Sequence, residues 1–106
     1  MISINKLLIL RCLLDGKQLP LSKVNGIVNF TLGKERPYSY LRNDIRDLHS
    51  KNLISYIKSS ALERDNKKYI KITEAGKIHY KKLENEFLKD FRIREKIKED
   101  IKRDIQ

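Results

Sequence analysis

The sequence predicts an α+β domain that is mostly helical, and three observations lead to this class. Several segments carry apolar residues at helical spacing, and two short segments late in the chain are rich in β-branched and aromatic residues. The 106 residues are enough to bury one modest core. We therefore expect the order helix, helix, turn, helix, β-hairpin and a long last helix.

The first helix is expected to begin after Ser3, whose side chain can cap it, and to end at Asp15-Gly16. An extended stretch at residues 18–20 leads into a short second helix at residues 21–30. Gly26 either weakens that second helix or marks close packing. The first helix is expected to be largely buried, because apolar residues surround most of its circumference: Ile4, Leu7, Leu8, Leu10, Leu13 and Leu14.

The third helix follows a turn at residues 31–36 and is expected to run from Pro37, which suits a first helical position, to about Lys51. Leu41, Ile45 and Leu48 define its inner face. Asp44 and Asp47 point to one flank. At a turn of about 100° per residue, hydrogen-bonding and basic side chains form the opposite face, with Tyr40 and Arg42 at its edges: Arg36, Ser39, Asn43, Arg46 and Ser50.

Residues 53–58 and 68–72 are expected to pair as a β-hairpin, because both are rich in strand-forming residues and the second alternates apolar and polar positions. The tip between them, residues 59–67, is polar and charged. Four basic side chains in and beside this tip outnumber Glu63 and Asp65: Lys58, Arg64, Lys67 and Lys68.

The last helix can be capped by Thr73 and can continue to Ile105, over about 48 Å if it is unbroken. Such a helix cannot pack wholly against so small a body. Its distal half repeats isoleucine at a spacing of four, so we expect it to pair with a second copy of the chain, although a strict heptad is not kept. The residues expected at this dimer interface are apolar: Leu83, Phe87, Phe91, Ile97 and Ile101.

The charge balance directs attention to polyanionic partners. The chain has a net charge of +10, and residues 1–73 hold most of it, with 14 Lys and Arg against 6 Asp and Glu. With 40% hydrophobic and 36% charged residues, the composition is too apolar for a disordered chain and too charged for a membrane span.

No constellation of catalytic residues is found, so we expect a protein that is not an enzyme and needs no cofactor, metal or small-molecule ligand. The single cysteine, Cys12, excludes an internal disulfide and fits a reducing cytosol. His49 and His79 lie on separate helices without metal-site spacing. The apolar start is interrupted by Arg11, so neither a signal peptide nor a membrane anchor is expected.

Two stretches resemble motifs of a known family. They are Leu-His-Ser-Lys-Asn-Leu-Ile at residues 48–54 and Lys-Tyr-Ile-Lys-Ile-Thr-Glu-Ala-Gly-Lys at residues 68–77. Together with the element order, they resemble the PadR-like and MarR-like winged helix-turn-helix transcription regulators over nearly all of residues 4–88. The resemblance implies a DNA-binding domain at residues 1–73 and a dimerisation helix at residues 74–106. It also implies a cytoplasmic homodimer, with a recognition helix in the major groove and a wing near the minor groove.

The third helix also suits DNA by its own chemistry, because arginine can bind the O6 and N7 atoms of guanine and asparagine can bind the N6 and N7 atoms of adenine. The leading hypothesis is a sequence-specific regulator of double-stranded DNA, acting as a repressor by occluding a promoter. An architectural or chromatin DNA binder and a winged-helix protein-interaction module are the alternatives, and RNA binding stays open. The expected recognition contacts are Arg36, Ser39, Tyr40, Arg42, Asn43 and Arg46, and the expected wing contacts are Lys58, Arg64, Lys67 and Lys68.

Overall fold

A computed structural model describes residues 3–57 and 68–89, and within these ranges the chain forms four α-helices and one three-stranded antiparallel sheet. The helices are α1 (Ile4–Cys12), α2 (Leu21–Leu32), α3 (Ser39–Ser50) and α5 (Glu74–Lys89). The strands are β1 (Leu19–Pro20), β2 (Ile54–Ile57) and β3 (Tyr69–Ile72). The predicted α+β class, mostly helical, is confirmed.

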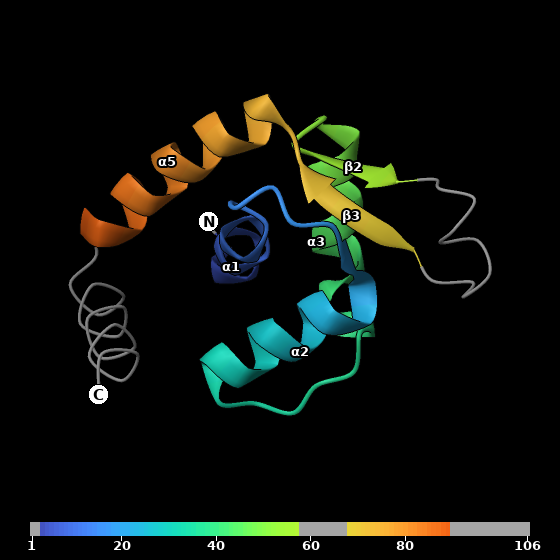
Figure 1. Cartoon of the computed structure of the whole chain (residues 1–106). Helices are drawn as coiled ribbons and strands as arrows, with labels where there is room; N and C mark the ends of the chain where they lie inside the picture. The colour runs from blue at the N-terminus through green and yellow to red at the C-terminus, as the bar shows by residue number, and fades with distance from the viewer. Residues whose placement is uncertain (1–2, 58–67, 90–106) are drawn as a thin grey trace.

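Helix α1 lies at the centre of the fold, with α2, α3 and α5 packed around it (Figure 1). The hydroxyl of Ser3 accepts a hydrogen bond from the Lys6 amide at 3.4 Å, as expected for the cap. Ile9, Leu10 and Leu13 have no exposed surface, because the surrounding helices contact α1 from several sides. A helix that is apolar around most of its circumference is stable only in such a central place.

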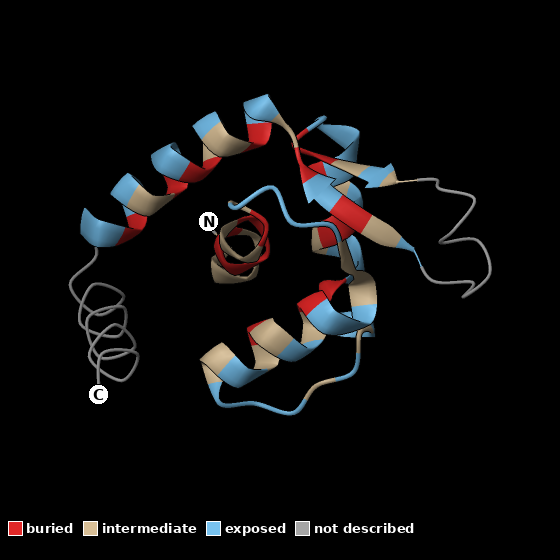
Figure 2. Cartoon of the chain, viewed as in Figure 1, coloured by how far each residue is buried: buried red, intermediate tan, exposed pale blue. Residues whose placement is uncertain are grey.

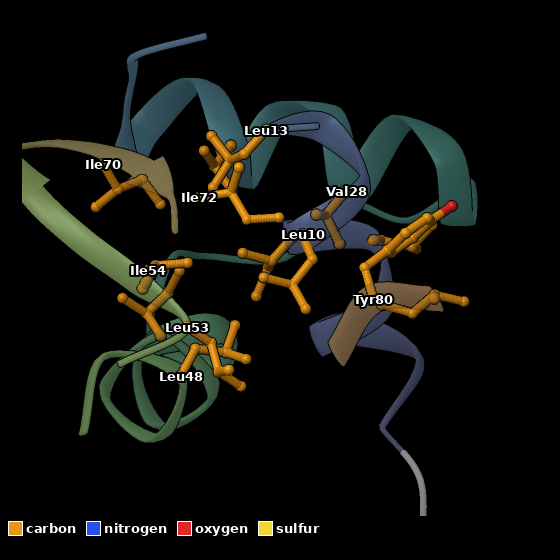
Figure 3. Packing of buried hydrophobic residues seen from close by; sticks show 14 of the residues in the cluster. Leu10, Leu13, Val28, Leu48, Leu53, Ile54, Ile70, Ile72 and Tyr80 are labelled. Carbon is orange, nitrogen blue, oxygen red and sulfur yellow. The ribbon is translucent and has the colours of Figure 1, made fainter. Parts of the chain in front are cut away.

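The core collects one apolar stripe from each surrounding element (Figure 2). Leu41, Ile45 and Leu48 of α3 face inward, as their spacing predicts. Figure 3 shows Leu10 of α1 among side chains from the other elements, including Leu48 and Tyr80. Burial of this apolar surface is the main force holding the helices together.

The sheet has the order β1-β3-β2. Strands β2 and β3 pair antiparallel with Ile54 opposite Ile72 and Ile57 opposite Tyr69, which confirms the predicted hairpin. Strand β1 pairs with the other edge of β3, with Leu19 opposite Ile70. The sequence predicted only an extended stretch there, because two residues are too few to show strand alternation.

The end of α3 and the start of α5 are joined by hydrogen bonds. Asn52 has a φ of 63°, and the Leu53 amide donates to the Leu48 carbonyl at 2.9 Å, which is the Schellman arrangement. The Thr73 amide donates to the Leu53 carbonyl at 3.1 Å. A Cβ atom added to Gly76 would lie 2.1 Å from that carbonyl oxygen, so only glycine allows the two segments to come this close.

Several predicted boundaries differ from the structure. Helix α3 begins at Ser39 and not at Pro37, and α2 continues to Leu32, where Gly33 ends it with a φ of 65°. Gly26 is exposed and has no atom within 4 Å of an added Cβ, so it weakens α2 and does not mark close packing.

Leu83 and Phe87, which were predicted for a dimer interface, are buried within the chain itself. They form the inner stripe of α5 with Gly76 and Tyr80, and they are 8% and 2% exposed. They are buried in the chain's own core, in which α5 packs against α1, so neither is free to contact a second copy. The domain boundary predicted at residue 73 falls inside this shared core. The other predicted interface residues, Phe91, Ile97 and Ile101, lie outside the described residues.

Candidate nucleic-acid interface

The outer face of α3 carries most of the residues predicted to contact DNA. The helix is strongly amphipathic, since its three apolar residues are buried and the polar ones are on the other side. His49 and Ser50 continue the exposed face to the end of the helix. Five predicted recognition residues are exposed: Ser39, Tyr40, Arg42, Asn43 and Arg46. These five residues present two guanidinium groups, one amide and two hydroxyls to the outside.

Asp47, on the flank of α3, is neutralised by two lysines. Its Oδ2 atom accepts from the Lys6 Nζ of α1 at 2.5 Å and from the Lys51 Nζ at 3.0 Å. These hydrogen bonds, which outweigh a small desolvation effect, hold the pKa of the Asp47 carboxyl below its ordinary value of 3.8. The carboxylate is thus paired with lysines of the same chain, and its pair with Lys6 ties α1 to α3.

Arg36 does not lie on the helical face to which the sequence assigned it, because α3 starts three residues later. It is half-buried, and its Nη2 atom donates to Asn5 Oδ1 of α1 at 3.4 Å. Its guanidinium carbon is 5.3 Å from the centre of the Tyr40 ring. The residue is thus engaged by groups of its own chain.

Two tyrosines, Tyr38 and Tyr56, lie at the border of this face. The ring centres of His49 and Tyr56 are 4.4 Å apart, which joins the end of α3 to β2. Burial of the side chain raises the pKa of Tyr38, and the nearby Tyr56 raises it further. Arg42 and Arg46 act in the opposite direction. Tyr38 therefore lies within electrostatic range of both arginines.

In the sequence, the only indication of this border is that aromatic residues lie near basic ones. Strand periodicity places Tyr56 outside the core, but nothing local pairs it with His49, seven residues earlier and on another element. Their contact follows from the tight turn at Asn52, which brings β2 back along the end of α3.

Of the four basic residues predicted to make wing contacts, one, Lys68, is among the described residues. It is exposed just before β3, and its Nζ is 6.0 Å from the centre of the Tyr56 ring. The hairpin and α3 lie on the same side of the molecule, and α5 lies on another (Figure 1). The other three predicted wing residues, Lys58, Arg64 and Lys67, lie outside the described residues.

The described residues contain no cluster of three or more His, Cys, Asp or Glu side chains that could hold a metal ion. Cys12 is partly buried, and its Sγ atom donates to the Ile9 carbonyl at 3.0 Å. Burial raises the pKa of the Cys12 thiol to about 11, although the hydrogen bond opposes this. Over residues 3–57 and 68–89, no helix combines the length and the apolar character needed to cross a membrane.

Comparison of the chain with protein-family models found no match. Searches of the curated proteins and of the solved structures found no match either.

Proposed function

We propose that the protein is a sequence-specific regulator of transcription that binds double-stranded DNA through a winged helix-turn-helix. In this proposal α2 and α3 are the helix-turn-helix, α3 enters the major groove, and the β2–β3 hairpin is the wing. The order of the described elements and the small antiparallel sheet are compatible with that fold. The likeness of residues 48–54 and 68–77 to the PadR-like and MarR-like regulators supports the same assignment.

The observation that carries the proposal is the exposed polar face of α3, where one of the two flanking acids, Asp47, is paired within the chain. Arg42, Asn43 and Arg46 are exposed, and Asp47 is held by Lys6 and Lys51. A carboxylate left free on this helix would repel phosphates, whereas a paired one reduces that repulsion. The face thus offers donors for guanine and adenine edges together with positive charge for the backbone.

The border of the face adds groups that suit the DNA backbone. Lys68 and His49 both lie near the ring of Tyr56, at the base of the proposed wing. Lysine ammonium groups are common donors to phosphate oxygens. We propose that the sugar-phosphate strand beside the major groove lies along this border, and that the basic wing residues continue the contact.

We propose that the functional unit is a homodimer that represses by occluding a promoter. Two copies would place their α3 helices in successive major grooves, about 34 Å apart, on a pseudo-palindromic site. Because Leu83 and Phe87 are buried in the core, this dimer would have to use other surfaces of the chain. Sedimentation tests the dimer directly, and a monomer at working concentration would contradict it.

The experiment that tests the function is a fluorescence-anisotropy titration with random duplex and with the DNA upstream of the protein's own gene, each at several salt concentrations. A specific regulator should show a salt dependence on both and a much tighter complex on an operator. If the upstream DNA lacks the operator, selection from a pool of random duplexes supplies one.

The other outcomes identify the alternatives. Equal affinity for every duplex, including the selected pool, would contradict sequence-specific regulation and favour an architectural binder. Failure to bind any duplex at low salt would contradict DNA binding and favour a protein partner. In that case Phe30, which is 89% exposed on α2, is the first surface residue to probe.

A further inference from the structure

The connection between α2 and α3 is anchored at one carbonyl group. The Arg36 carbonyl oxygen accepts hydrogen bonds from the side-chain amides of Asn29, at 2.7 Å, and Asn25, at 3.2 Å. The two asparagines are four residues apart on α2 and so lie on one face of that helix. The anchored carbonyl directly precedes Pro37, whose ring restricts the backbone before α3 begins.

The side chain of Arg36 extends the anchor to the two other helices. Its Nη2 atom donates to Asn5 of α1, and its guanidinium lies over the ring of Tyr40 in the first turn of α3. Arg36 thus contacts α2 through its backbone and α1 and α3 through its side chain. Half-buried among these groups, its guanidinium is less free to reach a base than that of Arg42 or Arg46, which are exposed.

We propose that Arg36, together with Asn25 and Asn29, sets the orientation of α3 against α1 and α2, and that Arg36 is a positioning residue and not a base contact. The expected effect on DNA binding rests on the proposed function, because a recognition helix reads bases only when it is held at a defined angle. Hydrogen bonds are directional, so two of them to a single carbonyl restrict how α2 and α3 can be oriented. A recognition surface binds its partner well only when its side chains are held close to the required geometry. The polar anchor therefore acts on DNA through α3.

The first test compares variants for their DNA binding. Arg36→Ala and Asn29→Ala should each lower the ratio of operator affinity to random-duplex affinity about tenfold, because a misplaced helix loses base contacts. The salt dependence should stay as in the wild type, since no phosphate contact is removed. A phosphate-binding arginine would instead reduce the salt slope by about 1.

The conservative variant separates geometry from charge. Arg36→Lys keeps the positive charge but loses the planar group that spans Asn5 and Tyr40. It should behave like Arg36→Ala if Arg36 positions α3. Restoration of wild-type binding by lysine would overturn the inference. Lys34→Ala is the matched control, because it removes a positive charge from an exposed position in the same connection and should leave specificity unchanged.

The second test needs no DNA. The amides of Tyr40 and Leu41 donate to the carbonyls of Pro37 and Tyr38 at 3.1 and 2.8 Å, so they report on the first turn of α3. Their hydrogen exchange should become faster in Arg36→Ala and Asn29→Ala than in the wild type or in Lys34→Ala. Unchanged exchange would overturn the inference whatever the DNA result. Faster exchange in a protein that binds no duplex would support the anchor and contradict only the proposed function.

Discussion

The hydroxyl group of Thr73 donates a hydrogen bond to the carbonyl oxygen of Asn52 at 2.7 Å and accepts one from the Gly76 amide at 2.9 Å. One side chain therefore caps α5 and holds it against the turn that ends α3. Asn52 and Thr73 belong to the two sequence stretches, residues 48–54 and 68–77, that resemble winged-helix regulators. Their contact joins the start of α5 to the turn that ends α3.

Replacing Thr73 with alanine should lower the free energy of unfolding by about 1 to 2 kcal/mol, because both the helix cap and the bond to Asn52 are lost. Urea denaturation measures this change. The control is Thr73→Ser, which keeps the hydroxyl and should be closer to the wild type. Equal stability of the alanine and serine variants would show that the hydroxyl contributes nothing.

Gly76→Ala and Gly26→Ala should change stability in opposite directions. Alanine at residue 76 would bring its Cβ against the Leu53 carbonyl oxygen, so the two segments must separate and stability must fall. Alanine at residue 26 meets nothing and should stabilise α2 by about 0.5 to 1 kcal/mol. Thermal or urea unfolding of both variants checks the signs, and stabilisation by Gly76→Ala would contradict the close approach.

Asp47 should make stability dependent on pH in the acid range. Its pKa is lowered in the folded protein by the hydrogen bonds from Lys6 and Lys51, so its contribution is present above the ordinary value of 3.8. The contribution is lost as the pH falls through the lower, folded-state pKa. Asp47→Asn should therefore be less stable than the wild type at neutral pH, and the difference should shrink towards zero in strong acid.

The measurement is a series of urea titrations from neutral to strongly acidic pH. Lys6→Gln removes one of the two partners, so it should reduce the difference without abolishing it. A difference between wild type and Asp47→Asn that does not depend on pH would show that the ion pairs do not stabilise the fold.

Cys12 should react slowly with alkylating reagents in the folded protein. Burial raises the pKa of its thiol to about 11, so almost none of it is thiolate at neutral pH. Mass spectrometry of iodoacetamide labelling, with and without urea, gives the rate in each state. The folded protein should label far more slowly than the unfolded one, and equal rates would contradict the buried position.

Arg46→Ala should weaken binding to an operator by about 1 to 3 kcal/mol and affect random duplex little, if the exposed guanidinium reads a base. Anisotropy titrations with both duplexes measure the two losses. Lys82→Ala is the matched control, since it removes one positive charge from the exposed side of α5. An equal loss on both duplexes would make Arg46 a phosphate contact instead.

The order and type of the elements follow from local patterns. Helical spacing at Leu41, Ile45 and Leu48 predicts α3 and the side of it that is exposed, since an amphipathic helix buries its apolar stripe wherever it packs. Ser3 and Thr73 predict the helix starts because a cap bonds only within its own turn. These features need no knowledge of the remaining chain.

Only the tertiary structure determines which residues each exposed or apolar group contacts. Leu83 and Phe87 look the same in sequence whether a second copy or α1 covers them, and here the cover is α1. The side chain of Arg36 turns inward because its partners lie on α1 and α3, and Asp47 is paired with a lysine 41 residues away in the chain. Periodicity assigns a residue to a face, but the neighbours of that face are set by contacts between distant segments, which the local pattern does not encode.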